Sequence, residues 1–434
     1  MSSNTHATMP SKPHRILITL PWADCQSNIL LRTLVDDAHA ADITWLTDGE
    51  QPITTQPFRF EPVAWNFQPF GTFRAANSIA FRLRLYRIAE AAMYDRRLQQ
   101  SADQLADIVR KVSPDALWAV ATTTQIGVLD RLLDRIEVPL HLTIHDDPES
   151  AAHINSCWPH ALARAVDRAW PRLIQRATSI DTVSFQMRDY IRARFGRDSI
   201  VLPPTPTAPL TDSPPAALDQ HLRLGISGSW CNLDDSLLAF GQGLQCAQRQ
   251  GLFKELTLSW LDGQRALLHR TPRDVRSLLP PGAGQFLPRL SESDAIRALA
   301  ACHVNYLTFW YPDEVLRRTS NPSKLRMFLP AARPIIIHGP DDCMPVQFAR
   351  EHGIGVVWNN MDPDAFPGVL EQALRQLDDW PDLRTRYLAL IDGQLSVAKN
   401  RATFWSTLDA ACRGERMAAG VNACSAPADL AFRR

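Results

Sequence analysis

The 434-residue sequence lacks several features that would assign it to a class at once. It has no excess of charge of either sign, because 46 basic residues are balanced by 46 acidic ones, so its composition does not favour a nucleic-acid partner. Apolar runs such as residues 16–20 and 335–337 are far shorter than the roughly 20 residues that cross a bilayer. We therefore expect neither a transmembrane helix nor nucleic-acid binding.

The eight cysteines form no Cys-x-x-Cys pair and no cluster with histidine at the spacing of metal ligands. We interpret them as small buried hydrophobic residues of a cytoplasmic protein, and we expect no metal site. Residues 1–13 are polar and lack the apolar core of a secretion signal, so they are expected to form a disordered tail.

Apolar segments of strand length alternate with helical segments through the first half of the chain. The pattern predicts strands over residues 14–20, 42–46, 115–120, 140–144, 179–183 and 199–202, and helices over 101–112, 124–133, 161–175 and 185–195. This order is typical of a parallel, doubly wound sheet. Six prolines within residues 202–215 then exclude a central strand or a helix and indicate a linker.

A second series of alternating segments follows the linker. The pattern predicts strands over residues 222–227, 256–261, 303–308, 334–338 and 355–358, and helices over 233–250, 292–301, 324–329, 345–352 and 365–377. We therefore predict an α/β protein with two tandem Rossmann-like doubly wound domains. The expected boundaries are an N-terminal domain over 14–202, a Pro-rich linker over 203–220, a C-terminal domain over 221–380, and terminal helices with a loose tail over 381–434.

Ligands of open α/β sheets bind outside the carboxyl ends of the strands, so polar residues after the strands are candidates for a site. His145 and Asp146 follow the expected strand over 140–144. An imidazole titrates near neutrality and a carboxylate can hold its tautomer, so this pair suits acid/base work or contact with a donor. The alternative is a turn in which an aspartate caps the next segment.

Three further loops carry candidates in the second domain. Gly228 and Ser229 follow a strand, and a glycine there permits close approach to a phosphate, although an ordinary turn would look the same. Arg289 could donate to a phosphate or carboxylate as a fork, or be solvated. Glu314 could accept from sugar or ribose hydroxyls, or form a surface salt bridge.

The segment Ser320-Asn-Pro-Ser-Lys324 is expected to open the helix over residues 324–329. Ser320 and Ser323 can cap this helix, and Lys324 adds a positive charge beside the positive end of its dipole. Such a place suits a diphosphate. The alternative is an ordinary capped helix with a surface lysine.

The order of these loops on two tandem domains resembles the GT-B glycosyltransferases, in particular the retaining, metal-independent family 4-like group that builds bacterial surface polysaccharides and glycolipids. The resemblance runs from about residue 14 to 377. It is carried by residues 143–146, 177–204 and 291–364, and by the elements Pro322-Ser323-Lys324, Arg333-Pro334 and Gly353-Ile-Gly355.

The resemblance implies transfer of a sugar from a nucleotide-sugar to an acceptor hydroxyl, in a cleft between the domains and with no cofactor. His145 and Asp146 would be catalytic, with His145 near the transferred sugar. The donor would be held by the remaining candidates, with the diphosphate near Gly228, Ser229 and Ser323, its charge met by Arg289 and Lys324, and a sugar or ribose hydroxyl bound by Glu314.

Two departures from the family's pattern keep other functions open. Met327 stands where a ribose-binding carboxylate is usual, and Ala332 stands where glycine is usual before Arg-Pro. A catalytically degenerate GT-B protein acting as a partner or scaffold is one alternative. A GT-B nucleotide-sugar epimerase is another.

The expected acceptor is a glycan or a lipid-linked molecule. Residues 65–73 and 80–88 interleave aromatic residues with Arg82, Arg84 and Arg87, as a segment at a membrane surface would. This pattern predicts a peripheral contact with the inner face of the membrane. The alternative is a domain helix with snorkelling arginines.

Overall fold

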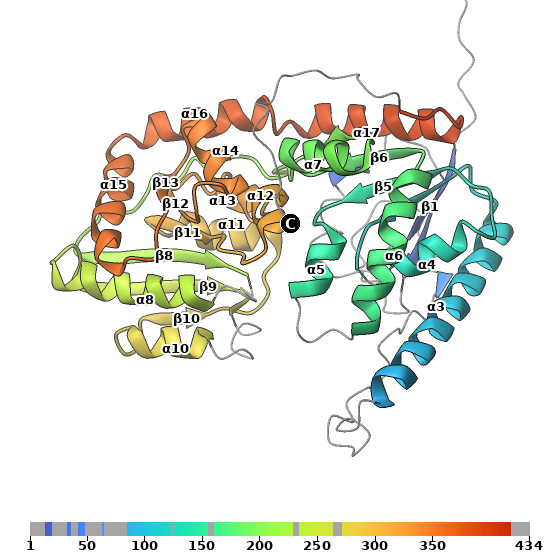
Figure 1. The fold of residues 1–434 in the computed structure, drawn as a ribbon. Coiled ribbons are helices and arrows are strands. Elements are labelled where there is room, and N and C mark those ends of the chain that lie inside the picture. The colour runs from blue at the N-terminus through green and yellow to red at the C-terminus, as the bar shows by residue number, and fades with distance from the viewer. Residues whose placement is uncertain are drawn as a thin grey trace, which may run out of the picture. The chain divides into compact units, whose positions relative to one another are not determined.

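The computed structural model describes residues 14–19, 33–35, 42–47, 63–64, 85–123, 125–154, 160–228, 234–263 and 271–417. They divide into two compact units, each described by itself (Figure 1). The first unit contains the chain up to Asp181, the segment Ile191–Ile200 and the chain from Ala402. The second contains Thr182–Tyr190 and Val201–Arg401.

The first unit is built on a seven-stranded sheet of order β3-β2-β1-β4-β5-β6-β7. Its strands are β1 (Arg15–Thr19), β2 (Asp42–Thr47), β3 (Val63–Ala64), β4 (Ala116–Val120), β5 (Leu140–Ile144), β6 (Ser179–Thr182) and β7 (Ile200–Val201). The pairings from β3 through β5 are all parallel. Strands β4 and β5 are buried along their whole length, because helices cover both faces of a sheet of this kind.

Helices of the first unit form a layer beside this sheet. They are α3 (Leu85–Val112), α4 (Ile126–Leu132), α5 (Pro148–Ile154), α6 (His160–Arg176) and the part of α7 (Phe185–Phe195) from Ile191 onward. Helices α3, α4 and α6 contact one another, and Figure 1 shows them together on one side of the sheet. Helix α3 begins well before the expected residue 101, and α5 was not expected.

A helix from the end of the chain completes the first unit. Helix α17 (Val397–Cys412) places Phe404 against two sheet side chains, with ring centroids 4.4 Å from Trp118 and 5.2 Å from His141. The indole nitrogen of the next residue, Trp405, donates to the carbonyl of Leu34 over 2.8 Å. Both aromatic rings are buried, so the core of this unit includes residues that are almost 300 positions apart in sequence.

The second unit has a six-stranded, entirely parallel sheet of order β10-β9-β8-β11-β12-β13. Its strands are β8 (His221–Ser227), β9 (Glu255–Leu261), β10 (Gly284–Phe286), β11 (Val304–Thr308), β12 (Ile335–His338) and β13 (Val356–Trp358). Two parallel, helix-covered sheets confirm the predicted fold class.

The helices that accompany this sheet are α8 (Asp234–Arg249), α10 (Thr271–Leu278), α11 (Glu292–Ala300), α12 (Glu314–Thr319), α13 (Leu325–Phe328), α14 (Met344–His352), the 3-10 helix η1 (Pro363–Ala365), α15 (Phe366–Asp378) and α16 (Trp380–Asp392). Elements α10, β10 and α12 were not expected from the sequence. The Pro-rich segment 203–220 forms no helix or strand, and it is pinned to the second unit. The Arg333 guanidinium donates to the Ser213 carbonyl over 3.0 Å, and Thr211 N–H donates to the Pro330 carbonyl over 2.8 Å.

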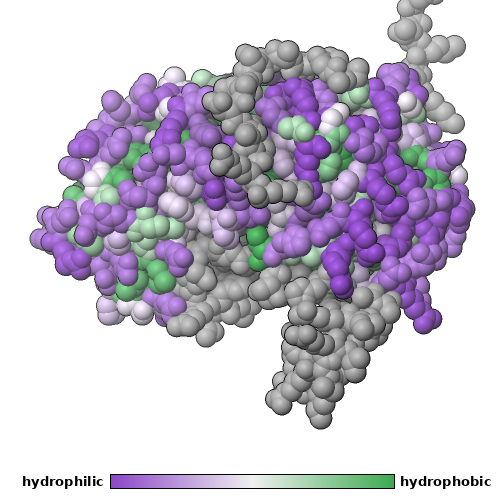
Figure 2. Space-filling view, in the orientation of Figure 1, coloured by the Kyte–Doolittle hydropathy of each residue, from purple (hydrophilic) through white to green (hydrophobic). Residues whose placement is uncertain are grey.

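The surface shown in Figure 2 is mostly hydrophilic, with hydrophobic residues scattered among the hydrophilic ones. Three of the described cysteines, Cys246, Cys302 and Cys343, are buried, as expected. None of the helices within the described ranges has the length and apolarity needed to cross a membrane.

We predict that Phe404→Ala destabilises the chain by about 3–5 kcal/mol, because it opens a cavity against Trp118 and His141. Urea unfolding of the intact protein measures this change. Thr403→Ala is the control, since Thr403 is exposed on the same helix turn. Equal stability of the two variants would show that α17 contributes little to the core.

Candidate functional site

His145 and Asp146 lie where strand β5 ends in the first unit. The His145 side chain is half-buried and the Asp146 side chain is exposed. Burial lowers the pKa of His145, and the nearby carboxylates of Asp181 and Asp146 only partly offset this effect. The imidazole is therefore neutral at physiological pH, and one of its nitrogens can accept a hydrogen bond while the other donates.

A buried polar network lies beneath this strand end. The Asp181 carboxylate accepts from His141 Nε2 over 2.8 Å and from Thr143 Oγ1 over 2.5 Å. The Trp118 indole donates to Thr143 Oγ1 over 2.9 Å, and His141 Nδ1 lies 2.7 Å from Ser179 Oγ. A buried carboxylate needs such partners, and here they fix the last residues of β5 to β6.

The next aspartate of the motif has a structural role. Asp147 is buried and accepts from Ser150 N–H over 2.9 Å at the start of α5, and from the Trp170 indole over 3.2 Å. It therefore caps the following helix, as the alternative reading of this turn proposed. The candidate pair His145 and Asp146 precedes this cap.

Neighbouring strand ends in the first unit carry buried polar groups that sequence reasoning missed. Thr19 ends β1, and Gln125 follows β4, which pairs with both β1 and β5. Both side chains are fully buried, and their Thr19 Oγ1, Gln125 Nε2 and Gln125 Oε1 atoms make no hydrogen bond within the described chain. Buried polar groups are normally satisfied, so a hydroxyl-bearing ligand or a water would complete them.

In the second unit, Lys324 lies directly against Gly228 at the carboxyl end of β8. Gly228 has a φ of 105°, and a Cβ built there would lie 2.4 Å from Lys324 Cε and 3.1 Å from its Nζ. The Trp260 indole holds the Gly228 carbonyl over 2.8 Å, and Gly228 N–H donates to Leu261 O over 3.1 Å. A primary ammonium is thus placed beside a glycine that has no side chain, at the edge where such sheets bind ligands.

The helix expected at Lys324 is shorter than the sequence suggested, and the capping prediction is wrong. Helix α13 has four residues, its N-cap is Lys324, and no side chain caps it. The N–H of Leu325 donates to the Pro322 carbonyl over 3.1 Å, so the turn uses backbone where Ser320 or Ser323 was expected. Lys324 therefore lies over Gly228 at the start of a helix that is too short to have a strong dipole.

Buried polar atoms without partners gather in the segment from Trp310 to Asn321. Trp310 Nε1, Ser320 Oγ and Asn321 Oδ1 make no hydrogen bond within the residues that the structure describes. This segment is fixed in place, because Asn321 Nδ2 donates to the Val183 carbonyl over 3.3 Å and Ser184 Oγ donates to the Thr319 carbonyl over 2.5 Å. A polar ligand beside α12 and α13 would satisfy these groups, each of which costs about 1–3 kcal/mol when left bare.

The remaining donor-site candidates lie in different surroundings. Glu314 begins α12 and accepts from Arg318 Nη1 over 2.7 Å. This is the salt bridge that the sequence analysis gave as the alternative to binding a hydroxyl group. Arg289 is exposed after β10, and β9 separates β10 from β8 in the sheet. Ser323 is half-buried beside Lys324, and Ser229 lies outside the described residues. The aromatic and arginine segment 65–84 also lies outside them.

The two departures from the family's pattern have clear local structures. Met327 packs its side chain against the hydrophobic core of the second unit. Ala332 has a φ of 49°, in the left-handed region that favours the glycine usual at this position. Arg333 is buried and donates to the carbonyls of Cys302, Ala332 and Ser213, so its role is to hold backbone.

The described ranges contain no group of three or more His, Cys, Asp or Glu side chains that could hold a metal ion. Both ring nitrogens of His338, at the end of β12, have hydrogen-bond partners within the protein. Its Nε2 donates to the Asn360 carbonyl over 2.8 Å, its Nδ1 accepts from the Tyr306 hydroxyl over 2.6 Å, and its ring stacks on Trp358. Burial lowers the pKa of His338 to about 3.

No protein-family model and no curated protein sequence matches this chain. Among solved structures, it is similar to a UDP-forming α,α-trehalose-phosphate synthase from Burkholderia xenovorans, at 12% identity and a TM-score of 0.60, covering 92% of this chain and 99% of that one. It is similar to a sucrose-phosphate synthase from Thermosynechococcus elongatus, at 14% identity and a TM-score of 0.64, covering 92% and 100%. It is also similar to an E. coli trehalose-6-phosphate protein bound with UDP-2-fluoro glucose, at 13% identity and a TM-score of 0.59, covering 91% of this chain and 98% of that one. The chain has the fold of these GT-B glycosyltransferases.

We predict that Gly228→Ala displaces Lys324, because the new Cβ would overlap its side chain and the φ of 105° is strained for alanine. Gly368→Ala is the matched control, since a Cβ there meets nothing within 4 Å. Urea unfolding should show Gly228→Ala less stable by more than 1 kcal/mol and Gly368→Ala unchanged or slightly more stable. Two unaffected variants would contradict the placement of Lys324.

We predict a stability loss in mild acid that is traceable to His338. The unfolded chain binds a proton at this residue below about pH 6.5, whereas the folded chain binds it only below about pH 3. The free energy of unfolding therefore decreases as the pH falls from about 6.5 to about 3. The slope is about 1.4 kcal/mol per pH unit. Urea unfolding from pH 7.5 to 4.5 should be steeper in pH for the natural chain than for His338→Gln. Equal slopes would contradict a buried neutral imidazole.

Proposed function

We propose that this chain is a glycosyltransferase that moves a sugar from a nucleotide-sugar to an acceptor hydroxyl. The observation that carries the proposal is the side chain of Lys324 lying over Gly228 at the carboxyl end of β8. In a doubly wound domain this edge is where nucleotides bind, and the neighbouring segment from Trp310 to Asn321 offers polar atoms that lack partners within the described chain. The similarity to GT-B structures supports the same function by analogy of fold.

Lys324 would act on the leaving group. In the reaction the bond between the anomeric carbon and the donor diphosphate breaks, and a bond from that carbon to the acceptor oxygen forms. Negative charge therefore grows on the departing nucleoside diphosphate, and a fixed ammonium beside it lowers the energy of the transition state. Gly228 would let the diphosphate approach the backbone closely.

His145 would contact the transferred sugar from the first unit. Its neutral imidazole can both accept from and donate to hydroxyl groups, and Asp146 beside it is exposed and acidic. Thr19 and Gln125, on neighbouring strand ends, offer further hydrogen-bonding atoms to a hydroxyl-rich molecule. We propose that the acceptor is a glycan or a lipid-linked sugar of a bacterial surface polymer, used without a metal ion at the inner face of the membrane.

A non-catalytic partner subunit with the same fold is the second candidate. It is favoured by Met327, whose side chain packs into the hydrophobic core where a ribose-binding carboxylate is usual in the resembling family. It is favoured also by Glu314, which is engaged by Arg318. Loss of a ribose contact would weaken donor binding, so binding and turnover have to be measured separately.

The proposal is tested by thermal unfolding and calorimetry of the intact chain with UDP, GDP, ADP and their sugars, without added metal. A nucleotide at 100 times its dissociation constant should stabilise the protein by about 2.7 kcal/mol. Lys324→Ala should abolish this stabilisation, because it removes the charge beside the diphosphate. The matched control is Lys254→Ala, an exposed lysine in the same unit.

Turnover is then followed as release of nucleoside diphosphate from the nucleotide-sugar that binds. His145→Ala should retain nucleotide binding and lose most of this release. Binding without release in the natural chain would favour the non-catalytic partner. No stabilisation by any nucleotide, or equal loss in Lys254→Ala, would overturn the proposal.

A further inference from the structure

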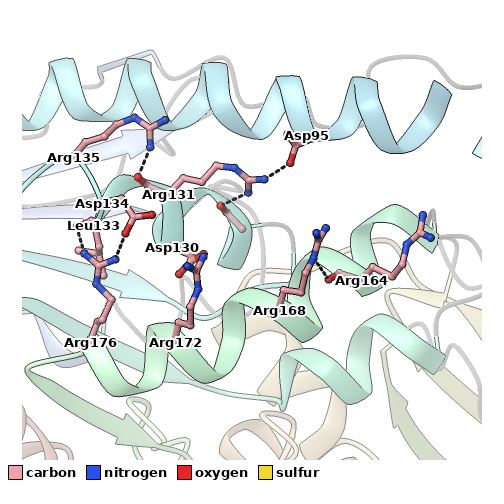
Figure 3. Close-up of polar contacts among 11 residues, drawn as sticks. Asp95, Asp130, Arg131, Leu133, Asp134, Arg135, Arg164, Arg168, Arg172 and Arg176 are labelled. Carbon is pink, nitrogen blue, oxygen red and sulfur yellow. Dashed lines mark hydrogen bonds and ion pairs between the residues drawn. The ribbon is translucent and has the colours of Figure 1, made fainter. Parts of the chain in front are cut away.

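Helix α6 carries a stripe of arginines away from the candidate site. Arg164, Arg168, Arg172 and Arg176 follow one another at every fourth position, which places them on one face of the helix. Figure 3 shows all of them pointing from α6 toward the side where α4 and α3 lie. A stripe of one charge is stable only if each member finds an anion or water.

The C-terminal half of the stripe is paired within the protein. Arg172 forms an ion pair with the buried carboxylate of Asp130, and Arg176 forms one with Asp134, both on or beside α4 (Figure 3). Arg131 of α4 forms an ion pair with Asp95 of α3, and Arg135, just after α4, forms one with Asp103 of α3. The acidic side chains that face this half of the stripe are therefore already used.

The N-terminal half of the stripe has no such partner. Arg164 and Arg168 are exposed, and neither forms an ion pair with a carboxylate in the part of the chain that the structure describes. Arg168 Nε donates to the Arg164 carbonyl over 3.1 Å, which ties the Arg168 side chain to the backbone one turn earlier in α6. Like charges four residues apart on a helix repel each other, so an anion placed between them would be bound favourably.

These two arginines line a cavity of about 530 Å³ between α3 and α6. This volume lies in the range of small-molecule sites. Its other walls include Tyr94, Leu98, Ala161 and Ala165. The cavity thus joins two guanidinium groups to an aromatic and aliphatic lining, which suits a molecule with a compact body and one anionic end.

Two carboxylates also line the cavity, and each has a polar partner beside it. Asp95 is paired with Arg131, and Asp167 lies 3.0 Å from His153 Nε2. Arg131 offsets the charge of Asp95 from outside the stripe, so three guanidinium groups in all accompany the two carboxylates. The charge of Arg164 and Arg168 remains available to a ligand.

We propose that the cavity between α3 and α6 binds a phosphate monoester through Arg164 and Arg168. A guanidinium donates two parallel hydrogen bonds to a phosphate, and a dianion with three oxygens can accept from both arginines at once. The body of the ester lies against Tyr94, Leu98 and the two alanines. The ester can be a free small molecule or the exposed phosphate of a lipid headgroup, since the recognised chemistry is the same.

The test uses the full chain carrying Lys324→Ala, so that phosphate bound at the proposed donor loop does not contribute. Phenyl phosphate binding is measured by calorimetry, and binding to phosphatidylcholine vesicles with and without phosphatidic acid is measured by sedimentation. Arg164→Gln with Arg168→Gln is compared with Arg96→Gln plus Arg110→Gln, which removes the same charge from α3 outside the cavity. Loss of each charged hydrogen-bonding group should weaken binding about 10-fold.

The site, with a free ester as its ligand, is supported if the Arg164 and Arg168 substitutions weaken phenyl phosphate binding about 100-fold and the control pair leaves it intact. Binding only to vesicles containing phosphatidic acid, with the same dependence on Arg164 and Arg168, supports the site and a lipid source. Absence of both kinds of binding overturns the proposal. Equal loss in the two pairs also overturns it, because it would show attraction by net charge alone.

Discussion

Parallel pairing of buried strands is the constraint on which the candidate residues of each unit depend. A parallel strand must be reached by a crossover, so every strand of a sheet ends at the same edge and every crossover starts there. The edge collects His145, Thr19 and Gln125 in the first unit, and Gly228 and Lys324 in the second. Burial of the strands leaves only these ends to meet a ligand, which is why chemistry concentrates in loops that are far apart in sequence.

Much of this arrangement could be predicted from the sequence, because β12 begins with three isoleucines, β5 and β8 carry Leu or Ile at every second position, and a polar residue or turn follows each strand. The continuity of α3 from the helix suggested near residues 79–88 to the one expected from residue 101 could not be predicted, and neither could the presence of α12. In residues 85–100 charged and aromatic residues obscure the helical period, and α12 depends on a local cap by Asp313, which accepts from Leu316 N–H over 2.9 Å. Motif reading identified Lys324 but not its contact with Gly228, since the fold brings the start of α13 to the end of β8.

Ala332 shows how a departure in sequence can leave a structure unchanged. The turn before Arg333 requires a left-handed residue, and alanine adopts it at a modest cost in strain. Its carbonyl accepts from the Trp380 indole over 2.8 Å and from Arg333 Nη1 over 3.0 Å, which holds the turn in place. Met327 differs in kind, because it replaces a group that would face a ligand with one that faces the core. Of the two departures, only this one alters the chemistry available to a donor.

Helix α17 has a consequence for how the protein is made. Its first residues belong to the second unit and its later ones, including Phe404 and Trp405, fill the core of the first. During synthesis the sheet of the first unit emerges from the ribosome roughly 200 residues before these side chains exist. Trp118 and His141 lack these aromatic neighbours until residues 404 and 405 have been translated, so the N-terminal half is missing part of its core at that stage, and such a nascent chain is a natural client for chaperones.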